Sequence, residues 1–131
     1  MTSLSRALVP LAWLVPAGIL IQAILAGQAI FVSPSLFGLH GGVGHGVLLL
    51  AILTAALAWA NRRRPAAWLG AGVVVALVAQ IGLGYTGHRA GMASASAWHV
   101  ALGVALLGTS VAVAMLLTLR RASAAHPAPS R

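Results

Sequence analysis

The residues of this sequence best suited to metal chemistry are two histidines, His40 and His99, which occur in matching contexts. Each begins a His-x-x-x-Gly motif, which ends at Gly44 in one case and at Gly103 in the other. The chain contains no Cys, Asp or Glu, so histidine is the only strong metal ligand in its apolar segments. Two imidazoles that face each other across a helical bundle can bind a porphyrin iron from both sides. The two histidines are therefore predicted to ligate haem b.

A glutamine precedes each histidine motif and extends the repeat. A shift of 58 residues aligns Gln22 with Gln80 and Ala26 with Gly84, and a shift of 59 aligns the two His-x-x-x-Gly motifs. Small residues at every fourth position beside each glutamine favour close helix approach. The glutamines are expected either to form interhelical hydrogen bonds or to contact the haem site or a quinone. Residues 26 and 84 are expected to leave room for the porphyrin edges.

Three further basic side chains lie near this predicted site. His45 is the reserve iron ligand, although it follows His40 by five residues and so points about 140° away from it on a helix. His88 and Arg89 fall in the predicted outer loop, where they are expected to hold haem propionates, since arginine pairs well with carboxylates. The alternative is that the histidines begin their helices at the membrane surface without a ligand, and that the loop cations are only solvated.

Four long apolar segments must position these residues. Hydrophobic residues make up 60% of the 131-residue chain and charged residues only 6%, which is not typical of a soluble protein. A helix of about 20 residues crosses the bilayer core, and the predicted spans cover about 7–28, 39–60, 66–83 and 97–119. Short connections predict an all-α, up-down-up-down transmembrane bundle of two repeated hairpins, with the second and fourth helices at opposite corners. Residues 1–121 form this domain, and 122–131 are predicted to be a disordered cytoplasmic tail.

The net charge of +8 comes entirely from arginine. Seven arginines precede the first span, separate the second from the third, or follow the fourth, and Arg89 alone lies on the other side. The positive-inside rule therefore predicts a multi-pass protein of the inner (plasma) membrane with both termini in the cytoplasm. This distribution favours contact with anionic lipid over binding of nucleic acid. Without carboxylates or cysteines, no catalytic residue is predicted.

In these residues the chain resembles one half of the heme A synthase family, whose two four-helix halves each carry histidine ligands at the start of their second and fourth helices. The resemblance rests on His40, His99 and the segment QIGLG at Gln80–Gly84. The chain departs from that family in having one half, no pair of outer-loop cysteines and no glutamate in the first outer loop. The resemblance implies the haem-binding half alone. The sequence also resembles small uncharacterised four-helix membrane proteins of this size.

Two classes of function follow from these patterns. One is a haem b-binding membrane protein that serves electron transfer or haem handling, either as a homodimer or within a larger respiratory or assembly complex. The other is a cofactor-free membrane subunit or scaffold whose small-residue faces pack partner helices. A transporter is less favoured, since four helices without acidic residues offer little for ion coupling.

Overall fold

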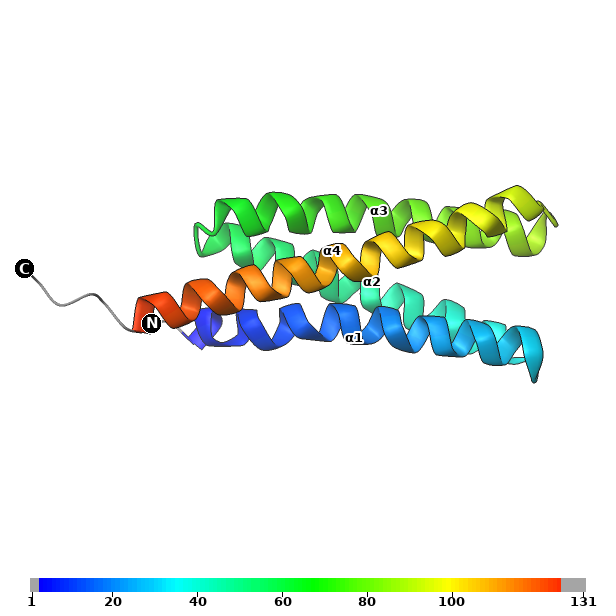
Figure 1. Ribbon diagram of the computed structural model, residues 1–131, viewed down its shortest axis with the longest axis horizontal. Coiled ribbons are helices and arrows are strands. Elements are labelled where there is room, and N and C mark those ends of the chain that lie inside the picture. Colours follow the sequence, from blue (N-terminus) through cyan, green and yellow to red (C-terminus); the bar gives the residue numbers. More distant parts are fainter. Residues whose placement is uncertain (1–2, 126–131) are drawn as a thin grey trace, which may run out of the picture.

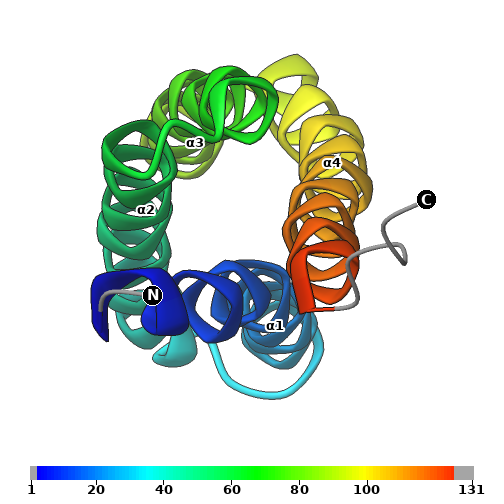
Figure 2. The same ribbon diagram turned by 90° about the vertical axis from the view of Figure 1, so that its left-hand side faces the viewer.

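The structure of the chain is a computed structural model that describes residues 3–125, with side chains described for 7–123. It contains four helices: α1 (Ser3–Phe31), α2 (Leu36–Ala60), α3 (Arg64–Arg89) and α4 (Ala93–Ala125). Each helix packs against its neighbours in the order α1, α2, α3, α4 and back to α1, and the diagonal pairs make no close backbone contact within the described residues. Seen end-on, the helices form a four-cornered ring (Figure 2). The predicted up-down-up-down bundle is confirmed.

The two ends of the bundle have different contents. The connection of residues 61–63 lies at the end where the chain begins and finishes, and connections 32–35 and 90–92 lie at the other (Figure 1). We call these the arginine end and the histidine end. At the arginine end, the Arg64 guanidinium lies 4.7 Å from the centre of the Trp59 ring, and this ring packs edge-on against Trp68 at 5.4 Å. Tryptophan and arginine together are typical of a membrane–water interface.

All four helices are long and apolar enough to cross a membrane, and the chain is a multi-pass membrane protein. The helices nevertheless extend beyond the apolar segments that predicted them. Helix α3 continues through Arg89, which places His88 and Arg89 in its last turn rather than in a loop. Helix α4 continues to Ala125, so the first four residues of the predicted tail are helical, and the rest lie outside the described residues. Apolarity marks the edge of the hydrocarbon, whereas helical hydrogen bonding continues past it.

Small residues bring the helices close together in the middle of the bundle. A Cβ atom added to Gly18 of α1 would lie 2.5 Å from a methyl group of Val47 on α2, and one added to Gly70 of α3 would lie 3.2 Å from the Cβ of Ala55. Apolar side chains fill this region and the arginine end. The histidine end is organised instead by a layer of polar side chains.

Candidate functional site

The two histidines of the repeat meet inside the bundle near its histidine end. His40 lies on α2 and His99 on α4, at opposite corners, and their ring centres are 6.1 Å apart with an angle of 63° between the ring planes. Both side chains are half-buried. The backbones of α2 and α4 are not neighbours, so the rings bridge the interior. The predicted placement of the pair is therefore confirmed.

Each histidine is held by the glutamine of its own hairpin through two reciprocal hydrogen bonds. The side-chain amide of Gln22 donates through Nε2 to the main-chain carbonyl oxygen of His40 (2.7 Å). In return, His40 Nδ1 donates to the main-chain carbonyl oxygen of Gln22 (3.1 Å). Gln80 and His99 repeat this arrangement with distances of 2.8 and 2.9 Å. We call each such set a Gln–His brace. The predicted interhelical bonds of the glutamines are therefore present, and the sequence repeat is also a repeat in space.

The brace explains why glycine follows each histidine by four residues. In a helix the carbonyl of a residue points toward the fourth residue after it, so the amide that reaches the histidine carbonyl must pass this position. A Cβ atom on Gly103 would lie 3.1 Å from Gln80 Nε2, and one on Gly44 would lie 3.5 Å from Gln22 Nε2. Glycine leaves the space that the glutamine amide needs.

The same geometry gives Gly84 a different role from the one expected. The carbonyl of Gln80 points toward residue 84, and the His99 ring reaches it there, so a Cβ on Gly84 would lie 3.0 Å from His99 Cε1. Gly84 thus admits the imidazole itself and does not leave free space for a porphyrin edge. The first hairpin has Ala26 at the equivalent position, and its ring–carbonyl hydrogen bond is longer, at 3.1 Å against 2.9 Å.

The braces also determine which nitrogen of each ring is available. A carbonyl can only accept, so Nδ1 of His40 and of His99 carries the hydrogen, and the neutral imidazole leaves the Nε2 lone pair free. Histidine ligands of metals are commonly oriented by this type of bond. With a metal–nitrogen bond of about 2 Å, two imidazole centres on opposite sides of one metal ion are roughly 6 Å apart. The observed separation fits two axial ligands.

The pair supplies only these two protein ligands. Among the residues that the structure describes, no three His, Cys, Asp or Glu side chains gather closely enough to hold a metal ion. An ion at the pair would take its other ligands from elsewhere, and the four nitrogens of a porphyrin meet that need.

The other predicted site residues form separate aromatic contacts where α2 and α3 pack together. His45 is exposed and faces Tyr85, with ring centres 6.3 Å apart. The Arg89 guanidinium lies 4.9 Å from the centre of the same tyrosine ring, and His88 stacks on Phe37 at 4.4 Å. Sequence reasoning gave Tyr85 and Phe37 no role. The position of the tyrosine one helical turn before Arg89 was the available signal.

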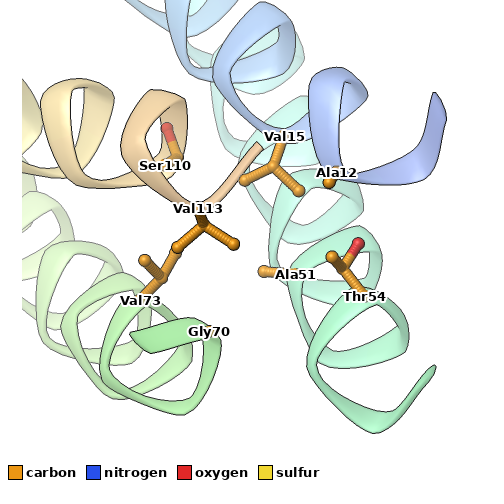
Figure 3. A pocket seen from close by; sticks show the side chains of 8 residues that line it. All are labelled: Ala12, Val15, Ala51, Thr54, Gly70, Val73, Ser110 and Val113. Atoms are coloured by element: carbon orange, nitrogen blue, oxygen red, sulfur yellow. The ribbon is translucent and has the colours of Figure 1, made fainter. Parts of the chain in front are cut away.

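A small cavity in the middle of the bundle shows the repeat in a second form. Side chains from all four helices surround it (Figure 3), and neither histidine of the pair is among them. Its lining consists of four pairs of residues that the shifts of 58 and 59 relate: Ala12 and Gly70, Val15 and Val73, Ala51 and Ser110, and Thr54 and Val113. The cavity therefore lies on the axis that relates the two hairpins.

Together, the fold and the braces define a multi-pass, four-helix membrane protein made of two like hairpins that join a histidine pair. The chain belongs to the Family of unknown function (DUF6220), whose sequence profile matches residues 22–87. The match begins at Gln22 and includes His40 and Gln80, but it ends before His99. No curated protein and no solved structure matches the chain. The comparisons give no link to heme A synthase and agree with the expected small uncharacterised membrane family.

Proposed function

We propose that this chain is a haem b-binding membrane protein that serves electron transfer or haem handling, with His40 and His99 as the axial ligands. The supporting observation is the pair itself, whose ring centres lie 6.1 Å apart while each Nδ1 donates to a backbone carbonyl. When bound, the haem would supply an iron centre able to gain and lose one electron.

The glutamines have a positioning role in this proposal. Each glutamine orients an imidazole, because its main-chain carbonyl oxygen accepts a hydrogen bond from Nδ1–H. Its side-chain amide also binds the main-chain carbonyl of the histidine and so links the two helices of the hairpin. A hydrogen bond at Nδ1 fixes the tautomer and raises the basicity of Nε2. Rings that are held before binding lose little freedom on binding. Gln22 and Gln80 therefore tune ligands without contacting iron.

Haem entry requires the histidine end to widen, because the His99 ring already contacts Gly84. The first turns of α2 are suited to such movement. Added Cβ atoms at Gly38, Gly41 and Gly42 would have no neighbour within 4 Å, and glycine weakens helical stiffness at such positions. The propionate role expected of His88 and Arg89 stays a prediction, and both side chains are exposed in the last turn of α3 at the histidine end.

The test is an absorption spectrum of the detergent-purified protein, oxidised and reduced, with a pyridine haemochrome assay. The wild type produced with ample haem should show a low-spin bis-histidine spectrum with haem b, and His99→Ala or His40→Ala should abolish it. His45→Ala is the matched control, because this histidine is exposed on the outer surface and should leave the spectrum unchanged. A colourless wild type, or loss of the spectrum in His45→Ala alone, would overturn the assignment.

The orientation that this proposal uses places both termini and the arginine end in the cytoplasm of a cell with an inner (plasma) membrane. Its support is the position of Arg62, Arg63 and Arg64 at that end. Membrane-impermeant thiol reagents should label Ser35→Cys from outside, and should label Asn61→Cys and Ser123→Cys only after permeabilisation. Outside labelling of the latter two variants would reverse the orientation.

A cofactor-free subunit or scaffold is the second candidate, and the braces favour it in one respect. They satisfy four polar groups in each hairpin without any ligand, which suits a protein that packs against a second copy or a larger complex. In that case, the purified wild type stays colourless, and crosslinking in the native membrane captures a partner. Gln22→Leu should then weaken that capture.

A further inference from the structure

An exposed group of aromatic and basic side chains lies on the outer surface of the α2–α3 seam. We call it the seam patch, and it consists of His45, Tyr85 and Arg89. His45 and Tyr85 face each other, and Arg89 lies over the tyrosine ring, so the three form a continuous surface. The tyrosine is 46% exposed, and His45 and Arg89 are also exposed. Among the described residues, none of these three side chains forms a hydrogen bond or a ring contact with the braced pair.

The depth of His45 makes this exposure unusual. It follows Leu36, the first residue of α2, by nine positions, which is about 13 Å along a helix. A helix of 25 residues is about 37 Å long, so it extends only a few ångströms beyond each side of a hydrocarbon core of about 30 Å. His45 therefore faces lipid below the membrane surface. Polar side chains in that position are costly and usually indicate a function.

The hydrogen bonding of His45 indicates what it can bind. Its Nδ1 lies 2.8 Å from the carbonyl oxygen of Gly41 on the same helix, and since a carbonyl only accepts, Nδ1 carries the hydrogen. In the neutral ring, Nε2 is then a hydrogen-bond acceptor. The neighbouring Tyr85 contributes an aromatic face and a hydroxyl, and Arg89 contributes donors nearer the water. A suitable ligand is a flat ring with a hydroxyl at one end and an acceptor oxygen at the other.

We propose that the seam patch binds the ring of a lipid-soluble hydroquinone. One hydroxyl of the hydroquinone donates to His45 Nε2, the ring packs beside Tyr85, and the opposite oxygen accepts from Arg89. The hydrocarbon tail remains among the lipids. The sequence led us to expect a quinone at the glutamines, but the Nε2 of each glutamine is engaged in its brace. This site goes beyond the proposed haem function and does not require haem.

An anionic lipid headgroup is a poorer fit to the same surface. A phosphate would pair with Arg89 and His88 at the rim, because both are in the last turn of α3. It would leave the acceptor nitrogen of His45 unused at hydrocarbon depth, since a phosphodiester has no hydrogen to donate. A hydroquinone ring reaches that depth because it is itself soluble in lipid.

The test is the binding of decylubiquinol and decylubiquinone to the full chain in nanodiscs of neutral lipid, prepared without haem. The reduced form should bind about tenfold more tightly, the value of one hydrogen bond of ordinary strength. His45→Phe should remove that preference, whereas His45→Gln, which retains an acceptor, should keep part of it. Tyr85→Leu should weaken both forms. Val104→Ala, at an exposed position of α4, is the matched control and should change neither.

Equal binding of the two redox forms by the wild type would overturn the proposal, as would unchanged binding by His45→Phe with circular dichroism like that of the wild type. Native mass spectrometry in nanodiscs with phosphatidylglycerol tests whether the patch binds a lipid headgroup instead. Retention of that lipid by the wild type and its loss in Arg89→Ala, without any response to hydroquinone, would make the patch a headgroup site.

Discussion

The histidine end and the central cavity are built by the same four helices around the same axis, yet they differ in how far equivalent positions of the repeat carry the same residues. At the histidine end, equivalent positions carry the same polar residues, with glutamine, histidine and glycine in both hairpins. Around the cavity, three of the four equivalent pairs differ, as Ala51 and Ser110 or Thr54 and Val113 do. A reciprocal hydrogen-bonded set requires particular atoms at particular distances, whereas a small apolar space requires only about the right volume. The braces therefore preserve the symmetry that the cavity lining has lost.

The comparison also separates the two braces from each other. The second has glycine at position 84 and the shorter ring–carbonyl bond. It also leaves Gln80 Oε1 buried without a hydrogen-bond partner among the described residues. The second brace thus has the shorter hydrogen bond to its histidine ring. It also contains a buried, unpaired acceptor, which lowers the stability of the fold.

Of the variants that test this comparison, one with a branched side chain in place of Gly84 should lose the most stability. Its Cβ would lie 3.0 Å from the His99 ring, so Gly84→Val should displace the imidazole and break its bond to the Gln80 carbonyl. We expect a loss of about 2 kcal/mol in the free energy of unfolding, as for overpacking in a close-packed region. Denaturation in mixed detergent micelles, followed by circular dichroism, measures it.

The matched control for that variant is Gly82→Val on the same helix. An added Cβ at Gly82 has no neighbour within 4 Å, so this variant carries the same change of residue type without the contact. Equal stability of the two variants would mean that the His99 ring does not depend on the space at Gly84. The contrast between the two braces would then lose its physical basis.

A smaller effect should distinguish the two glutamines. Gln22→Leu and Gln80→Leu each remove one interhelical hydrogen bond, for which about 0.6 kcal/mol is typical in membranes. Gln80→Leu also removes a buried, unpaired oxygen, which offsets part of its loss. We therefore expect Gln22→Leu to be the more destabilising variant in the same micelle titration. The reverse order would show that Gln80 Oε1 has a stabilising partner.

Much of this arrangement could be predicted from the sequence, because the repeat relates distant residues without any knowledge of side-chain conformation. It aligned Gln22 with Gln80 and His40 with His99, and apolarity with short connections predicted the corners that they occupy. The reciprocal bonds could not be predicted, since they depend on the rotamers of both partners. The contact of Gly84 with the histidine ring was missed for the same reason.

The seam patch was missed because hydropathy places residues by depth and not by the face of a helix. His88 and Arg89 were assigned to a loop, since α3 was expected to end where its apolar residues end. One more turn of helix places Arg89 over the ring of Tyr85, which faces His45. The helical angle between His40 and His45 did indicate that only one of them could face the axis.

The smallest expected effect concerns the cavity, where exchanging the unlike members of one repeat pair should be nearly neutral. Ser110 donates its hydroxyl to the Leu107 carbonyl of its own helix at 2.9 Å, so the group depends little on the rest of the bundle. The double variant Ala51→Ser with Ser110→Ala moves the hydroxyl to the equivalent position on α2 and keeps the total volume. We expect the free energy of unfolding to stay within about 0.5 kcal/mol of the wild type. A loss above about 1 kcal/mol, measured in the same titration, would mean that the cavity needs its hydroxyl on α4. The loss of symmetry there would then be a requirement of that site, as the retained symmetry is a requirement of the braces.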